Sequence, residues 1–268
     1  MAERALGAGF RVTGYDLRSE QGDRLAEWGG LPLGSARAVA EAADWLVFSV
    51  MTTDDVAAAL GSCGDALAPG KVVIDCATGD PGRMARLAGD LEARGVRYLD
   101  ATIAGNSAET RRGEVLALVG GDGDTFARCR PFFESFAKQS FHLGPAGSGA
   151  RMKLVFNLVL GLHRAVLGEA LGFAERIGIR PEAALEILKA GTTYSYVMDN
   201  KGAKMLSRDF AVQAKLEQHL KDVELILKLG KETSAFLPLS AEHRTLLRRL
   251  VDGGDGALDN SAIVKAFD

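Results

Sequence analysis

Two polar residues interrupt a strongly apolar stretch near the middle of the chain, and their types and spacing suit chemistry. Lys153 and Asn157 lie four residues apart, so on a helix they would share one face. Apolar residues dominate from Met152 to Leu162, which leaves this helix no obvious solvent face. Burial favours the neutral amine of a lysine, and such an amine can act as an acid or a base near neutral pH. The alternative is that Lys153 extends to the surface and Asn157 only packs.

Two glycines precede this helix. Gly147 and Gly149 form a Gly-Ser-Gly segment, which is either an ordinary turn or a close approach to a phosphate group. A phosphate loop would continue with Lys and then Ser or Thr, whereas this chain continues with Ala150 and Arg151. The phosphate-loop pattern therefore fails.

The elements that must position these residues alternate between strands and helices. Short β-branched or apolar runs predict strands at residues 11–15, 45–50, 72–75, 98–100, 115–119 and 141–143. Helical stretches are expected between them at residues 19–28, 36–43, 53–60, 81–94 and 124–136. The alternation predicts an α/β fold with a mostly parallel, doubly wound sheet, which is a Rossmann-type dinucleotide-binding domain over residues 1–146.

The pattern changes after Gly144. Helical periodicity continues to the end of the chain, at residues 151–177, 181–190, 212–229, 240–251 and 260–267. No later run has strand character. Residues 147–268 are therefore expected to form an all-helical domain.

The beginning of the chain lacks the motif with which a dinucleotide-binding sheet normally opens. Such a sheet starts with a strand, a G-x-G-x-x-G turn and a helix whose N-terminus receives the pyrophosphate. Residues 2–6 read instead as the last turns of that helix, closed by Gly7 and Gly9. We expect an N-terminally truncated domain without the first strand and glycine loop, either because the reading frame starts at an internal methionine or because another segment fills the gap.

Asp16 ends the next predicted strand, where an acid hydrogen-bonds the 2′-hydroxyl of an adenosine ribose. An acid at this place repels a 2′-phosphate and so favours NAD over NADP. Arg18, two residues later, keeps NADP open as the cofactor. The alternative is a solvated Asp16, because turns at strand ends favour aspartate.

Composition and charge exclude several classes of protein. The chain has 268 residues, 47% hydrophobic and 25% charged, which is typical of a globular protein. A formal net charge of −3 gives no reason to expect a nucleic-acid partner. No unbroken apolar run approaches the ~20 residues of a membrane span, and no secretory signal opens the chain. Three widely separated cysteines predict a reducing, cytoplasmic location.

The histidines do not have the spacing of a metal site. His142, His163, His219 and His243 show no HExxH pattern, and no cysteine joins them. We therefore expect structural histidines and no metal.

Several motifs, taken in order along the chain, resemble those of one family. The spacing G-x-G-x-x-x-K-x-x-x-N at residues 147–157 resembles the catalytic motif of the β-hydroxyacid dehydrogenases, the 3-hydroxyisobutyrate dehydrogenase group related to 6-phosphogluconate dehydrogenase. Residues 100–107 resemble that family's substrate loop, and residues 113–121 resemble the strand after it. The remaining matches are a D-x-S-T-x-x-P cofactor turn, a loop beside the nicotinamide and a K-D motif, at residues 75–81, 47–52 and 220–222.

The resemblance implies hydride transfer between nicotinamide C4 and the carbinol carbon of a short 3-hydroxyacid, which interconverts the acid with its semialdehyde or oxo acid. Lys153 would exchange the hydroxyl proton and stabilise the developing oxyanion, with Asn157 orienting the substrate. Backbone N–H groups of a glycine-containing loop would bind the substrate carboxylate, at Thr102, Ala104, Gly105 and Asn106. Lys221 would close the pocket near the cofactor and the substrate.

The same resemblance implies a nicotinamide cofactor and a homodimer or homotetramer formed through the helical domain. NAD is favoured over NADP for the reason given at Asp16. The expected cofactor-binding residues are Asp16, Arg18, Val50, Met51, Thr52, Thr78 and Lys221.

Two departures from the family pattern leave other hypotheses open. Ala104 stands where the family usually has serine, which removes one hydroxyl donor from the substrate loop. Together with the absent glycine loop, this motivates a truncated, non-catalytic homologue that binds a small carboxylate or dimerises. A further alternative is imine reduction, which the related imine reductases perform without this lysine, so Lys153 argues against it.

Overall fold

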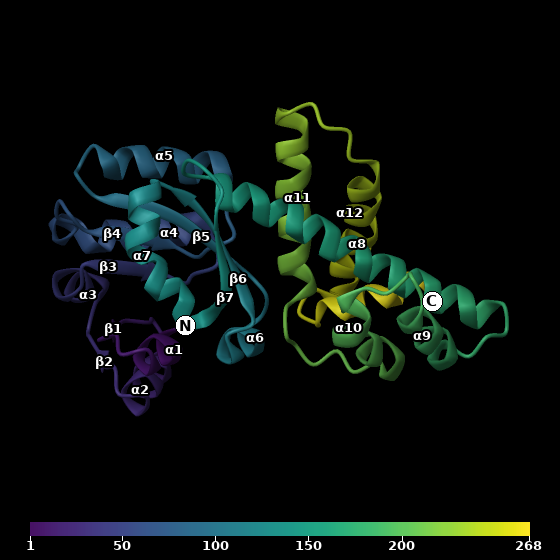
Figure 1. Ribbon diagram of the computed structural model, residues 1–268. Helices are drawn as coiled ribbons and strands as arrows, with labels where there is room; N and C mark the ends of the chain where they lie inside the picture. The colour runs from purple at the N-terminus through teal and green to yellow at the C-terminus, as the bar shows by residue number, and fades with distance from the viewer. The chain divides into compact units, whose positions relative to one another are not determined.

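The computed structural model describes all residues, 1–268, and they divide into two compact units, Met1–Lys153 and Leu154–Asp268. Figure 1 labels the helices and strands along the chain. Strands alternate with helices in the first unit, and the second unit consists of helices. The predicted order of an α/β sheet domain followed by a helical region is confirmed.

The first unit is built on a five-stranded sheet of order β3-β4-β5-β6-β7. The bounds are β3 Trp45–Phe48, β4 Val72–Asp75, β5 Arg97–Ala104, β6 Val115–Gly121 and β7 Ala137–His142. Neighbouring strands are parallel except β5 and β6, which are antiparallel because the segment between them holds only the short helix α6 (Ser107–Arg112) and is too short for a crossover. Two further strands, β1 Thr13–Gly14 and β2 Leu31–Pro32, form a separate parallel pair.

Helices cover both faces of the five-stranded sheet. They are α1 Ala2–Gly7, α3 Ala36–Ala42, α4 Thr53–Cys63, η1 Gly64–Ala66, α5 Pro81–Glu92 and α7 Gly123–Phe136. Helix α2, Ser19–Glu27, contacts β2 of the separate pair. Alternate residues of β4 belong to different cores, as the pleat of a strand requires. Val72 and Ile74 pack with α1 and the aromatic residues of α7, whereas Val73 packs with α3, α4 and α5. The sheet is therefore buried on both faces, and its strand ends are left for a site.

The second unit has its own hydrophobic core. Its elements are α8 Ser148–Arg176, which starts in the first unit, α9 Pro181–Ala190, α10 Tyr196–Ser207, α11 Leu216–Glu232, α12 Pro238–Leu250, η2 Val251–Asp255 and η3 Asn260–Phe267. A buried ion pair joins α10 to the residue before η3, with Lys201 Nζ lying 2.8 Å from Asp259 Oδ1. Asp259 also accepts hydrogen bonds from the backbone of Gln213 and Ala214.

Some elements differ from the sequence-based prediction. The last strand was predicted at residues 141–143, whereas β7 runs from Ala137 to His142. The prediction missed its first residues because exposed polar side chains at Lys138 and Gln139 interrupt the apolar run. Helix α11 begins at Leu216 and not at residue 212, because the Asp259 carboxylate holds the preceding backbone in a non-helical turn. The sequence predicts neither α6 nor α10, which carry few apolar residues at helical spacing.

Helix α8 is long enough and apolar enough to cross a membrane by length and composition, although the sequence contains no unbroken apolar run of that length. Core helices of water-soluble proteins pass the same test. Leu154, Leu167 and Leu171 of α8 are buried inside the structure.

Candidate active site

Lys153 and Asn157 lie one helical turn apart on α8, and both are buried. Lys153 is 8% exposed and Asn157 is 6% exposed, so neither side chain extends into solvent. The helix begins directly after Gly147, whose φ of +91° lies in the left-handed region that favours glycine. The Gly-Ser-Gly turn thus fixes the start of α8, and Lys153 lies within the first two turns of the helix.

Polar groups of the predicted substrate loop are already bonded within the first unit. Thr102 is fully buried, and its hydroxyl donates to the carbonyl oxygen of Gly149 at 3.2 Å. The side-chain oxygen of Asn106 accepts from the backbone N–H of Glu109 at 2.9 Å, and the Glu109 carboxylate accepts from the N–H of Asn106 at 2.7 Å. This reciprocal arrangement is a capping box at the start of α6. The Thr102 hydroxyl and the Asn106 side-chain oxygen therefore shape the loop.

Ala104 and Gly105 lie where β5 ends and the loop begins. Ala104 is buried and pairs with Leu116 of β6. Gly105 has a φ of +144°, and a Cβ atom there would lie 2.5 Å from Val115 Cγ1. Only glycine fits this position, and because it has no side chain, its backbone atoms are uncovered at the loop surface.

The loop expected beside the nicotinamide follows β3 and the expected cofactor turn follows β4, and the carboxyl ends of these strands meet at one edge of the sheet. The two segments contain the predicted residues Val50, Met51, Thr52 and Thr78. Thr52 caps α4 in a capping box, with its hydroxyl donating to the Asp55 carboxylate at 2.7 Å. The Thr53 hydroxyl accepts from the backbone N–H of Asp80 at 3.2 Å, which ties one loop to the other. The structure thus brings these predicted residues together.

Two carboxylates are fully buried at the same sheet edge. Asp75 is the last residue of β4, and its register partner Asp100 lies in the middle of β5. Burial raises the pKa of Asp75 to about 6, against the opposing effect of hydrogen bonds from the Tyr98 hydroxyl at 2.6 Å and the Ala77 N–H at 2.8 Å. Burial also raises the pKa of Asp100 to about 6, and the negative charge of Asp75 adds to this rise. No cation pairs with either carboxylate.

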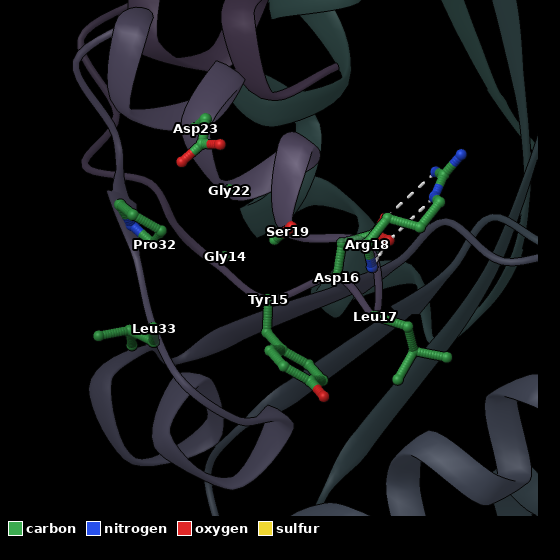
Figure 2. Close-up of a pocket in the computed structure, with 10 residues that line it drawn as sticks. All are labelled: Gly14, Tyr15, Asp16, Leu17, Arg18, Ser19, Gly22, Asp23, Pro32 and Leu33. Atoms are coloured by element: carbon green, nitrogen blue, oxygen red, sulfur yellow. Dashed lines mark hydrogen bonds and ion pairs between the residues drawn. The ribbon is translucent and has the colours of Figure 1, made fainter.

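A pocket lies at the carboxyl end of β1, and Figure 2 shows its lining. The Asp16 carboxylate accepts from the backbone N–H of Arg18 at 2.9 Å and from its Nε at 3.2 Å, and this hydrogen bonding lowers the pKa of Asp16. Tyr15 adds an exposed ring, and Asp23 lines the pocket apart from the Asp16 pair. An acid, a cation and an aromatic ring at a strand end fit the adenosine end of a dinucleotide.

The remaining predicted residues meet inside the helical unit. Asn157 Nδ2 donates to Asp222 Oδ2 at 2.9 Å, and Lys221 Nζ lies 3.5 Å from Asp222 Oδ1. Asp222 is 7% exposed, so it holds the Asn157 amide from inside the unit. The K-D motif therefore contributes its aspartate as a partner of Asn157.

Sequence reasoning missed the roles of Asp100 and Asp222. Asp100 accepts hydrogen bonds from residues 47 and 50 positions later, and Asp222 accepts from a residue 65 positions earlier. No local pattern encodes contacts at such separations. The available signal was that each aspartate stands inside a family-like motif.

Two family descriptions match the chain. One is the NAD binding domain of 6-phosphogluconate dehydrogenase, over residues 1–144. The other is the NAD-binding region of NADP-dependent 3-hydroxyisobutyrate dehydrogenase, over residues 147–267. Together they cover the sheet domain and the helical region.

Individual relatives and a solved structure indicate the same family. L-threonate dehydrogenase of Cupriavidus necator is 29% identical, over 100% of this chain and 91% of the relative. 2-Hydroxy-3-oxopropionate reductase of Escherichia coli is 30% identical, over 92% of this chain and 85% of the relative. The crystal structure of 3-hydroxyisobutyrate dehydrogenase from Salmonella typhimurium shares the fold with a TM-score of 0.91 at 24% identity, over 98% of this chain and 94% of that one. The chain therefore belongs to the β-hydroxyacid dehydrogenase family of NAD(P)-dependent oxidoreductases.

Proposed function

We propose that this chain interconverts a small 3-hydroxyacid and its semialdehyde or oxo acid, with Lys153 as the general acid and base. The observation that carries the proposal is a buried lysine on the first turns of α8, one turn before a buried Asn157. A bound NAD(P) supplies or accepts the hydride at C4 of its nicotinamide. The residues of the chain bind and orient the substrate and move its hydroxyl proton.

The proton has a defined path in either direction. During oxidation the carbinol C–H bond breaks as hydride leaves, and the hydroxyl proton passes to the neutral amine of Lys153. The products are the carbonyl compound, the Lys153 ammonium and the reduced nicotinamide. During reduction the Lys153 ammonium returns that proton to the developing alkoxide, which its charge also stabilises.

We assign substrate orientation to the loop after β5 and to Asn157. Ala104 offers no hydroxyl, and Asn106 uses its side-chain oxygen as a helix cap, so the bare backbone at Gly105 is the proposed carboxylate contact. Asn157 is held by Asp222 and would orient the substrate, with Lys221 nearby. The relatives are an L-threonate dehydrogenase and a 2-hydroxy-3-oxopropionate reductase, which supports a short hydroxyacid as the substrate class.

NAD is the proposed cofactor, with NADP as the alternative. Asp16 places a carboxylate at the end of β1, where it favours a free ribose 2′-hydroxyl and repels a 2′-phosphate. Arg18 bonds this carboxylate and is itself exposed, so it could turn toward a 2′-phosphate instead.

The direct experiment measures turnover of the purified chain with NADH and NADPH on a panel of short semialdehydes and 3-oxo acids. Calorimetry measures cofactor binding separately. We expect Lys153→Ala to lower kcat by roughly 10²- to 10⁴-fold while cofactor binding is retained. The exposed Lys138 gives the matched control, Lys138→Ala, which is expected to keep wild-type turnover. Wild-type turnover in Lys153→Ala would refute the role, and cofactor binding without turnover of any panel member would favour a non-catalytic homologue.

We also propose that α8 pairs with the α8 of a second copy. Met152, Val159, Val166 and Phe173 recur every seven residues and are 37% to 65% exposed. A seven-residue apolar repeat is the pattern by which two helices pack along their length. Exposed Arg151 near the start of α8 and Glu175 near its end would face opposite charges in an antiparallel copy.

The mass in solution tests this pairing. Light scattering should give a dimer or tetramer for the wild-type chain and a smaller species for Val166→Glu. Phe236→Glu, at a side chain that is 90% exposed outside α8, is the matched control. A monomeric wild-type chain, or an unchanged mass in Val166→Glu, would overturn the pairing.

The three cysteines are unpaired with one another, which suits the proposed cytoplasmic location.

A further inference from the structure

The start of α8 is held by a carboxylate from β5. Asp100 Oδ1 accepts from the N–H of Gly147 at 2.7 Å, and Asp100 Oδ2 accepts from the N–H of Ala150 at 2.7 Å. Asp100 itself is fully buried. Thr102, on the same face of β5, adds a third tie through its hydroxyl to the Gly149 carbonyl.

These bonds replace a cap that α8 cannot supply for itself. The first N–H groups of any helix lack partners within the helix, and a side chain at the preceding residue normally accepts from them. Here the preceding residue is Gly147, which has no side chain. Asp100 therefore provides both the acceptor and a negative charge at the positive end of the helix dipole.

The glycines around Asp100 make room for this contact. A Cβ atom on Gly120 would lie 2.5 Å from Asp100 Oδ1. A Cβ atom on Gly149 would lie 2.9 Å from Asp100 Oδ2 and 2.4 Å from the carbonyl oxygen of Leu118. All three distances are too short for a real side chain, so Gly120 and Gly149 allow the close approach of α8 to the strands.

We propose that Asp100 is a positioning residue for Lys153, acting by fixing the first turn of α8 against β5. Lys153 comes three residues after Ala150, less than one helical turn beyond the anchored N–H. Loss of the anchor frees the first turn to shift or fray and displaces the Lys153 amine. A displacement of about 1 Å can lower a rate by roughly 10²-fold. This inference rests on the proposed role of Lys153.

The test is a double-mutant cycle between Asp100→Asn and Lys153→Ala. Asparagine keeps the size of the side chain but turns an NH₂ group toward one of the two N–H donors, so one anchor is lost. We expect Asp100→Asn to lower kcat by roughly 10- to 100-fold with KM for the cofactor changed less than about threefold. In the Lys153→Ala background, measured by single turnover at high enzyme concentration, the same change should have an effect below about twofold.

A merely structural role predicts a different pattern. Asp100→Asn would then lower the folded fraction or multiply the loss equally in both backgrounds, and either result would overturn the proposal. Asp122→Ala is the matched control, because Asp122 caps a different helix, α7, by accepting from the N–H of Thr125 at 2.8 Å. Its kcat should equal that of the wild type.

Two further readouts keep the test decisive if Asp100→Asn folds poorly. Thr102→Val removes the neighbouring tie to Gly149 and is expected to lower kcat several-fold with the hydroxyacid KM unchanged; an unchanged kcat would overturn the proposal. Hydrogen exchange should accelerate at residues 147–153 of either variant and not in the later turns of α8. Wild-type turnover in Lys153→Ala would refute the proposed function instead, so the two failures are distinguishable.

Discussion

The two units of the molecule bury aspartates in opposite ways. In the helical unit, Asp259 lies 2.8 Å and 3.0 Å from Lys201 Nζ and accepts three backbone N–H groups. Burial alone would raise its pKa, but the Lys201 ammonium and the N–H groups hold it at about 2. In the sheet unit, Asp75 and Asp100 are just as buried, have no cation and have pKa values raised to about 6.

The difference separates a structural acid from acids that shape a site. A buried ion pair with every oxygen bonded locks one arrangement of helices, here α10 against the residue before η3. Asp75 and Asp100 instead hold backbone N–H groups of the turn after β4 and of the first turn of α8. Burial disfavours the charged forms of these two carboxylates, and both lie beside the groups proposed to bind the cofactor and move a proton. Perturbed pKa values cluster at such functional sites.

The largest expected effect comes from breaking the paired acid. Lys201→Met leaves the Asp259 charge buried without its cation, and we expect a loss of about 3–5 kcal/mol in the free energy of unfolding. Urea denaturation measures it. Lys189→Met removes an exposed pair with Asp199 in the same unit and should cost under about 1 kcal/mol. Equal losses in the two variants would contradict the assignment of Lys201 as a structural lock.

The space around Asp100 gives the next effect. Gly149→Ala forces a Cβ atom to within 2.4 Å of a backbone carbonyl, so we expect a loss of about 1–3 kcal/mol in unfolding free energy and a lower kcat. Gly89 lies in the interior of α5, and a Cβ atom there would meet nothing within 4 Å. Gly89→Ala should therefore raise the unfolding free energy by about 0.5–1 kcal/mol. An unchanged unfolding free energy in Gly149→Ala would show that α8 does not pack tightly against the strands.

The two kinds of buried aspartate make stability depend on pH in opposite directions. Asp75 and Asp100 have folded pKa values of about 6 against 3.8 unfolded, so the folded state binds more protons between these values. Their contribution to stability is full below about pH 3.8 and is lost as the pH rises through about 6. Asp259, with its lowered pKa, contributes above about pH 3.8 and loses that contribution as the pH falls through about 2.

Asp75→Asn removes part of this dependence. We expect its unfolding free energy to fall less between pH 5 and pH 7.5 than that of the wild type, by roughly 1–2 kcal/mol. Urea denaturation at both pH values checks this, with the exposed Asp90→Asn as control. A wild-type dependence in Asp75→Asn would place the source of the raised proton affinity elsewhere.

The smallest effect on stability belongs to an exposed acid. Arg18 and Asp16 form an exposed pair, so Asp16→Asn should change unfolding free energy by under about 1 kcal/mol. Its effect is expected on cofactor choice, with the ratio of kcat/KM for NADH over NADPH falling by roughly tenfold. Asp23→Asn, in the same pocket, is the control. An unchanged ratio would leave Asp16 as a solvated strand-end residue.

Local sequence patterns predicted most of the elements, though not α6 or α10, and the position of the lysine. Apolar periodicity indicated the α8 helix, and the two interruptions at Lys153 and Asn157 are both buried in the structure. The aspartates that hold this helix and the Asn157 amide were not predictable. Asp100 bonds the first turn of α8 and Asp222 bonds Asn157, each from another element across a long sequence separation. The start of α11 was missed for the same reason, since a distant Asp259 sets the backbone before it.

The loop residues show a different limit. Asn106 and Thr52 have the spacing of helix caps, with an acid three residues later, as well as a place in family-like motifs. Family resemblance suggested ligand contacts for both, and the structure shows that their side chains also cap helices. A residue's motif therefore indicates which site the residue lies near better than it indicates which of its atoms are free to bind a ligand.

Chemical rescue of Lys153→Ala tests the central claim, that the Lys153 amine exchanges the substrate proton, most directly. Turnover of this variant is measured with and without added methylamine, beside cofactor binding by calorimetry. We expect turnover to fall by roughly 10²- to 10⁴-fold, with intact cofactor binding and a partial restoration that rises with methylamine concentration. Turnover of Lys153→Ala near the wild-type rate without any amine would contradict it.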